Sequence, residues 1–147
     1  MRVRTLQAVA PVLCALAALG PPGCAAKRPG EVPVHPVKGR VTFNGEPMPY
    51  AVVTFFPVGR PFAQALKPRA TADADGYYEL TTYELKDGAP EGEYGVILYV
   101  PPTPPEPYAL EVPNPPDRLK NAYLDPAKSK LRYSVRPGPN TIDITLP

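Results

Sequence analysis

Proline constrains this chain more than any other residue type, because 24 of its 147 residues are proline. Proline fixes φ and lacks a backbone N–H donor, so it interrupts helices and is confined to the edges and ends of strands. The runs of apolar residues between the prolines are short, and several alternate with polar residues. The sequence therefore predicts short strands joined by rigid loops, in one domain of ordinary size.

The N-terminal segment has the features of an export signal. Two arginines precede a mostly apolar run at residues 6–19, and a Gly-Pro-Pro-Gly sequence ends this run just before Cys24. A membrane-spanning helix needs about 20 apolar residues, and this run is shorter. Residues 1–23 are therefore predicted to be a signal peptide.

Cys24 stands where such a signal ends. A cysteine after a small residue at the end of an apolar run resembles the lipobox of bacterial lipoproteins, whose cysteine becomes the acylated first residue of the mature chain. Gly23 fits that pattern, whereas Pro21 and Pro22 stand where leucine and a small residue are usual. The alternative is cleavage at a small-x-small site such as residues 15–17, with Cys24 incidental. The resemblance implies an exported protein anchored to a membrane through lipid on Cys24, in the periplasm or at the cell surface.

The segment at residues 24–36 is rich in proline and charge and shows no periodicity. We expect a semi-extended tether that holds a domain at residues 37–147 away from a membrane surface. His35 falls in this tether and is interpreted as a linker residue. Cys14 lies within the signal, so a mature chain beginning at Cys24 has one cysteine and forms no internal disulfide.

Charge and composition argue against several functions. Without the two N-terminal arginines, 14 of the 16 basic residues remain against 14 acidic ones, and a near-neutral chain with no evident basic cluster is not expected to bind nucleic acid. Besides His35 and Cys24, the mature chain offers only Ser129 and Ser134 for a catalytic or zinc-binding set. A paired-carboxylate hydrolase is the remaining enzymatic alternative. We therefore expect a non-catalytic protein without a cofactor.

The region after the tether shows the alternation of half-buried strands. At residues 37–43 apolar or small residues alternate with polar ones, and an Asn-Gly turn follows. A single helical turn is expected at residues 119–125. Short strands between turns, without a long amphipathic helix, indicate an all-β, antiparallel β-sandwich of about seven strands. The expected strands are residues 37–43, 51–57, 69–72, 77–83, 93–100, 131–136 and 141–146.

Residues 101–116 contain eight prolines and cannot form the interior of a sheet. We interpret them as a long extended loop with polyproline character. Within it, Tyr108, Leu110 and Val112 either pack on the sandwich or form a recognition surface. The fixed φ of proline lowers the entropy that such a loop loses on binding, which suits recognition.

The Asp-Ala-Asp-Gly sequence at residues 73–76 raises the question of a calcium site. An EF-type loop with glycine at position six would use Asp73 and Asp75 as ligands, but threonines stand at positions one and twelve. A turn needs only Asp side chains that bond backbone N–H groups and a glycine in the left-handed conformation. We therefore expect a structural turn with Gly76 at positive φ, and no metal.

Three motifs occur in the predicted strand region: a V-x-F-x-P pattern at residues 53–57, a T-x-x-x-D-G-x-Y-x-L pattern at 71–80, and a P-x-G-x-Y strand start at 90–94. They resemble motifs of the small transthyretin-like, or carboxypeptidase-regulatory-like, domains of bacterial surface lipoproteins, and the second has a slightly longer spacing than the family's. The resemblance covers most of residues 37–146. It implies a sandwich of about seven strands, in which the second motif closes a hairpin, and no particular reaction.

These features lead to a membrane-tethered, non-catalytic extracytoplasmic domain that acts as a structural or protein-binding module. Its expected partners are the membrane, through lipid on Cys24, and another surface protein or a glycan. The alternative is a small-ligand or carbohydrate carrier in which sugars stack on Tyr77, Tyr99 or Tyr123, although the chain has no tryptophan.

The anchor at Cys24 can be checked by intact-mass analysis of the mature protein. We expect a chain that begins at Cys24 and carries added acyl mass, and Cys24→Ala should release the protein from membranes. An unlipidated mature chain that starts at Ala18 or Lys27 would contradict the anchor.

Overall fold

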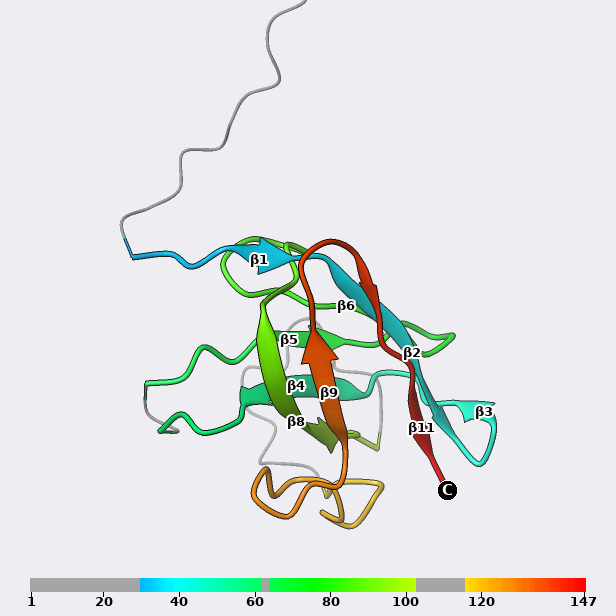
Figure 1. Ribbon diagram of the computed structural model, residues 1–147. Coiled ribbons are helices and arrows are strands. Elements are labelled where there is room, and N and C mark those ends of the chain that lie inside the picture. The colour runs from blue at the N-terminus through cyan, green and yellow to red at the C-terminus, as the bar shows by residue number, and fades with distance from the viewer. Residues whose placement is uncertain (1–29, 62–63, 103–115) are drawn as a thin grey trace, which may run out of the picture. The chain divides into compact units, whose positions relative to one another are not determined.

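Short strands joined by turns and loops make up the described part of the chain, which covers residues 30–61, 64–102 and 116–147 of a computed structural model (Figure 1). Two main sheets share one hydrophobic core, so the predicted all-β sandwich is confirmed. The strands are β1 (Val34–His35), β2 (Val37–Phe43), β3 (Glu46–Pro47), β4 (Val52–Pro57), β5 (Arg69–Thr71), β6 (Tyr77–Glu79), β7 (Ala89–Pro90), β8 (Gly92–Tyr99), β9 (Arg132–Val135), β10 (Asn140–Thr141) and β11 (Ile144–Leu146).

Several predictions concern residues outside this part of the chain. The anchor at Cys24 and the loop residues Tyr108, Leu110 and Val112 all lie there. Among the residues that are described, no helix is long and apolar enough to cross a membrane.

Strand β2 lies at the centre of the first main sheet. It pairs antiparallel with β3 and β6, and in parallel with the C-terminal strands β10 and β11. The alternation at residues 141–146 predicted the half-buried pattern correctly, but the single strand expected there is divided into β10 and β11. Alternation also carries no information about the direction of the neighbouring strand. The first sheet is therefore mixed, whereas the second is antiparallel throughout.

The second main sheet has the order β5-β4-β8-β9. Phe55 of β4 lies opposite Val96 of β8, and both are fully buried. The Phe55 ring lies 5.5 Å from the Tyr94 ring, centroid to centroid, so aromatic contacts extend this part of the core. The apolar side chains of β4 and β8 thus form the layer against which the first sheet packs.

Hydrogen bonds between β6, β2 and the C-terminal segment join the strands of the first sheet. We call the contact of Tyr78 with Ile142 over Gly39 the crossing. In a regular parallel ladder the Arg40 N–H would donate to the Ile142 carbonyl, because the Ile142 N–H already donates to the Lys38 carbonyl at 2.8 Å. Here Asp143 Oδ1 accepts the Arg40 N–H at 2.9 Å instead. The Ile142 carbonyl accepts from the Tyr78 hydroxyl at 2.6 Å.

Gly39 makes this crossing possible. A Cβ atom at position 39 would lie 1.8 Å from the Ile142 carbonyl oxygen and 3.1 Å from Cε1 of Tyr78. Only glycine therefore lets the carbonyl and the tyrosine ring meet across β2. Tyr78 is 2% exposed, and burial, with smaller contributions from Tyr133 and Asp143, raises the pKa of its hydroxyl far above the usual value. The hydroxyl is accordingly a permanent donor.

The domain begins earlier than predicted, because part of the expected tether is a strand. Strand β1 pairs antiparallel with β7, and Nδ1 of His35 accepts a hydrogen bond from the Gly138 N–H at 3.2 Å. The compact unit extends from Val32 to Pro147. The boundary after Pro36 and the interpretation of His35 as a linker residue are therefore wrong. Strand β1 has only two residues and stands among prolines and charged residues, so no periodic signal in the sequence indicates it.

The turn at residues 73–76 connects the two sheets and does not close a simple hairpin. Strand β5 pairs with β4, whereas β6 pairs with β2, and only the Arg69–Thr81 bridge joins the two segments beyond the turn. Gly76 has φ of +81°, as predicted. A Cβ atom there would lie 2.6 Å from the Val41 carbonyl oxygen, so the turn also packs tightly on β2.

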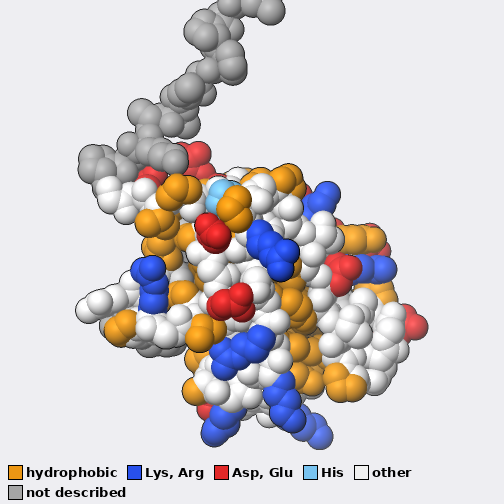
Figure 2. All heavy atoms as spheres, viewed as in Figure 1, with side chains coloured by type: hydrophobic (Ala, Val, Ile, Leu, Met, Phe, Trp, Pro, Cys, Tyr) orange, Lys and Arg blue, Asp and Glu red, His pale blue; other side chains and the backbone are white. Residues whose placement is uncertain are grey.

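The loop at residues 116–131 lies along the end of β8 that β9 does not cover. The Arg118 N–H donates to the Val100 carbonyl at 2.9 Å, and the Leu98 N–H donates to the Tyr123 carbonyl at 3.0 Å. The expected helical turn at 119–125 is wrong: the residues form successive tight turns, with Lys120 and Asn121 at positive φ. In Figure 2, Lys and Arg side chains gather at the lower end of the molecule, where this loop lies.

The Tyr78 crossing can be tested by Tyr78→Phe. Because the buried Ile142 carbonyl would lose its donor, we expect the free energy of unfolding to fall by about 1–3 kcal/mol in urea titrations. Tyr94→Phe is the control, since the Tyr94 ring is equally buried but its hydroxyl donates to the Pro90 carbonyl at 2.9 Å in a bond that is only partly buried. The control should lose less than about 1 kcal/mol. Equal losses would mean that the Tyr78 hydroxyl has no special role.

Candidate binding groove

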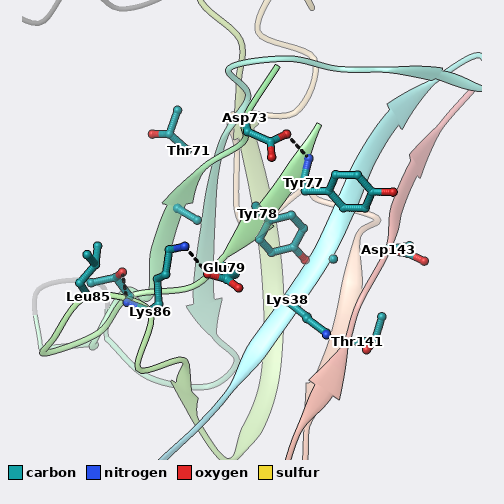
Figure 3. A pocket seen from close by; sticks show the side chains of 13 residues that line it. Lys38, Thr71, Asp73, Tyr77, Tyr78, Glu79, Leu85, Lys86, Thr141 and Asp143 are labelled. Atoms are coloured by element: carbon teal, nitrogen blue, oxygen red, sulfur yellow. Dashed lines mark hydrogen bonds and ion pairs between the residues drawn. The ribbon is translucent and has the colours of Figure 1, made fainter. Parts of the chain in front are cut away.

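An open groove of about 670 Å³ is lined by strands of the first sheet and by β5, the edge strand of the second sheet. Strands β2, β5, β6 and β10 contribute to it, and the loop after β6 forms one side (Figure 3). Tyr78 and Gly39 lie at its base, so the groove stands directly over the crossing that joins the sheet. Its base is therefore a rigid part of the fold.

Tyr77 and Leu85 are the apolar side chains exposed in this groove. Tyr77 is 55% exposed and Leu85 is 83% exposed. Figure 3 shows them on opposite sides of the groove, with Tyr78 and Glu79 between them. Large apolar side chains exposed beside a concave surface are typical of binding sites, whereas single exposed apolar residues are common elsewhere.

Arg40 fixes the position of Tyr77. Its guanidinium carbon lies 4.9 Å from the Tyr77 ring centroid, and its Nε donates to the Asp75 carbonyl at 2.9 Å. The cation–π contact covers one face of the ring and reduces the freedom of the side chain. Tyr77 is thus presented to solvent in a defined orientation.

Charged side chains surround the two apolar ones. Nζ of Lys86 lies 2.7 Å from Oε2 of Glu79, and this pairing raises the pKa of Lys86. Lys38 and Asp143 line the side near β10. The groove therefore combines an apolar contact on each side with a polar border of both signs.

Asp73 is a turn residue at the edge of the groove. Its Oδ1 accepts the N–H groups of Asp75 and Tyr77, both at 2.9 Å, and its own N–H donates to the Tyr77 carbonyl at 2.8 Å. These bonds support the predicted turn at 73–76. In the described ranges no group of three or more His, Cys, Asp or Glu side chains is placed to share a metal ion.

The nucleophiles considered from sequence lie in separate places. Ser129 donates to the Val96 carbonyl beneath the loop at 116–131, and Ser134 of β9 donates to Glu93. His35 belongs to β1 and accepts from a backbone N–H. The structure brings neither serine into a hydrogen bond with His35.

Of the three tyrosines considered for sugar stacking, only Tyr77 is exposed. Tyr99 and Tyr123 are half-buried, and Tyr123 packs against the core. Sequence reasoning missed Leu85, because a single leucine in a turn-rich segment gives no periodic signal that separates burial from exposure.

Comparison with known proteins assigns no family. Neither a protein-family model nor a curated protein sequence matches this chain. A crystal structure of a DUF3823 family protein from Parabacteroides merdae aligns with 78% of this chain and 46% of its own, at 15% identity and a TM-score of 0.39. The chain thus spans less than half the length of that protein. The all-β sandwich defines the class of this protein, and its transthyretin-like subclass remains a prediction.

The role of Asp73 can be separated from metal binding with two variants. Asp73→Ala should lower the free energy of unfolding by about 1–2 kcal/mol, because two N–H groups lose their acceptor. Asp75→Ala, which removes the neighbouring carboxylate while leaving Asp73 in place, should change it by less than about 0.5 kcal/mol. Calcium at about 1 mM should leave the melting temperature of the unmodified protein unchanged. A rise of several degrees that Asp75→Ala abolishes would establish a calcium site instead.

Proposed function

We propose that this protein is an exported, lipid-anchored and non-catalytic domain that binds a partner protein of the cell envelope through the groove between Tyr77 and Leu85. The observation that carries the proposal is the exposure of these two side chains on opposite sides of a groove with a rigid base. An aromatic and an aliphatic anchor inside a charged border have the composition of a protein-binding surface.

The position of the groove also supports binding. Its base consists of Tyr78 and Gly39, which the packing of the first sheet holds in place. A site formed on strands loses little conformational entropy when a partner binds. Tyr77, held by Arg40, contributes a large contact area at a small further entropic cost.

The cellular setting of the proposal comes from the sequence. Acylation of Cys24 would keep the domain close to a membrane, joined through the residues that precede Val32. A transthyretin-like domain of a surface lipoprotein is the subclass that best fits the motifs at 53–57, 71–80 and 90–94. Such a domain needs no catalytic residues to act as a scaffold or receptor.

Carbohydrate binding is the second candidate, and Tyr77 is the observation that favours it. An exposed tyrosine ring on the outer face of a sheet can stack against the apolar face of a sugar ring. Lys38, Thr141 and Asp143 line the same groove and can bond sugar hydroxyls. Leu85, which has no hydrogen-bonding group, is better explained by a protein partner.

The proposal can be tested by placing a photo-crosslinking amino acid at position 85 and analysing the products from intact cells by mass spectrometry. We expect one discrete adduct, with a yield at least about fivefold lower when Tyr77→Ala is added, because the aromatic anchor is lost. Position 58 is the matched control, since Val58 is 52% exposed and lines a different surface.

The same experiment distinguishes the two candidates. Identical adducts from positions 85 and 58, or a yield that Tyr77→Ala leaves unchanged, would contradict a protein-binding groove. Tyr77-dependent binding on a glycan array, without a protein adduct at position 85, would establish the carbohydrate alternative. Thermal melting of each variant confirms that it remains folded.

A further inference from the structure

Positive charge is concentrated in the loop at 116–131 and the start of β9. Between residues 118 and 136 there are six Lys or Arg residues and one acidic residue, Asp125. Residues 32–102 carry eight Asp or Glu and six Lys or Arg. The chain is therefore near neutral overall although acidic residues predominate in one segment and basic residues in another. The prediction that the chain lacks a basic cluster is therefore wrong. Five exposed residues define the basic surface: Arg118, Lys120, Lys128, Lys130 and Arg132.

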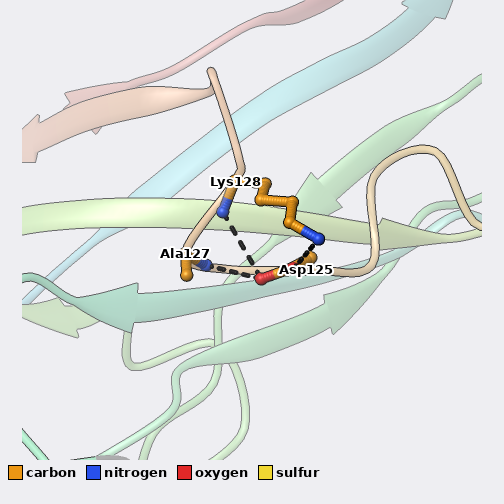
Figure 4. Close-up of polar contacts among 3 residues, drawn as sticks. All are labelled: Asp125, Ala127 and Lys128. Carbon is orange, nitrogen blue, oxygen red and sulfur yellow. Dashed lines mark hydrogen bonds and ion pairs between the residues drawn. The ribbon is translucent and has the colours of Figure 1, made fainter.

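The single carboxylate within this surface is already engaged (Figure 4). Asp125 accepts the Ala127 N–H at 2.9 Å and the Lys128 N–H at 3.4 Å, and its Oδ2 lies 3.3 Å from Nζ of Lys128. The bond from Ala127, followed by the contacts with Lys128, lowers the pKa of Asp125. Within the described part of the chain, the other four cations of the surface have no ion-pair partner. Their charge is available to an external anion.

The backbone that carries these cations is fixed to the core. Asp117 is only 7% exposed, and its carboxylate accepts the N–H groups of Val100 and Asn121, both at 2.8 Å. Ser129, also buried, donates to the Val96 carbonyl and accepts the Leu131 N–H at 3.2 Å. A loop held at both ends carries its cations on a backbone with little conformational freedom, which lowers the entropy lost on binding.

Arg132 extends the basic surface onto the sheet. Its Nη1 atom would lie 3.0 Å from a Cβ atom at position 95, so the side chain crosses β8 over Gly95. The five cations come from fifteen consecutive positions, 118–132, and do not converge on one enclosed point. This arrangement fits a chain of anionic groups better than a single small anion.

The location of the surface narrows the choice of partner. Strand β1, where the chain enters the domain, and the loop at 116–131 lie at opposite ends of the domain (Figure 1). If Cys24 is the anchor, as the proposed function requires, the basic surface lies at the end of the domain opposite to the strand that follows the anchored segment (Figure 1). We propose that it binds an anionic glycan polymer of the cell envelope, which carries carboxylate or phosphate groups along its length.

Affinity gel electrophoresis of the purified protein in polygalacturonate tests this proposal. At about 50 mM salt we expect retardation that disappears as salt rises to a few hundred millimolar, because screening weakens contacts between exposed charges. Lys120→Gln combined with Lys130→Gln should weaken binding about fivefold. Arg60→Gln combined with Arg69→Gln removes the same charge elsewhere and should weaken binding less than about twofold.

Each alternative gives a different result. No retardation by polygalacturonate, or equal weakening by the two double variants, would overturn the proposal. Stronger binding to phosphatidylglycerol vesicles, lost in Lys120→Gln with Lys130→Gln, would assign the surface to a membrane and also overturn it. Tyr77→Ala should leave retardation unchanged, so failure here is distinct from failure of the proposed groove.

Discussion

The hydrogen bond from Tyr78 to the Ile142 carbonyl, made across Gly39, is the interaction on which the first sheet depends. It replaces a ladder bond that β2 would otherwise make with the C-terminal strand, and Asp143 supplies the acceptor that Arg40 would then lack. Both polar groups displaced from the ladder thus find another partner, and the Ile142 carbonyl, whose bond is buried, requires one. One glycine, one tyrosine and one aspartate, each from a different part of the chain, therefore fix where β6, β2 and β10 meet.

The groove is a consequence of this crossing. Tyr78 turns inward to reach Ile142, and its neighbour Tyr77 points outward because successive side chains of a strand face opposite sides. Arg40, the neighbour of Gly39 on β2, then meets the Tyr77 ring. The register of the β2–β6 pairing that buries Tyr78 opposite Gly39 consequently also places Tyr77 opposite Arg40.

The sequence predicted the strand content better than the connections between strands. Alternation at residues 37–43 and the glycine at position 76 have local causes, and the structure agrees with both. The parallel pairing of β2 with the C-terminal strands and the pairing of His35 in β1 depend on contacts more than 50 residues apart in the sequence. At the groove, Tyr77 could be proposed as an exposed ring, but the exposure of Leu85 could not. The basic surface was missed because the net charge was summed over the whole chain. A count over residues 118–136 alone gives six Lys or Arg and one acidic residue.

The buried Asp117 contributes to the structure through its hydrogen bonds more than through its charge. Proline precedes it, so position 116 has no backbone N–H donor. The Asp117 carboxylate then accepts two backbone N–H groups, one from Val100 just after β8 and one from its own loop, and so fixes the loop to the sheet. Loss of one of these bonds would leave a buried charged acceptor partly unsatisfied, which costs more than a surface ion pair contributes. Asp117 therefore fixes the backbone that carries the basic surface, although its own charge is negative. Its structural role cannot be inferred from the net charge of the segment.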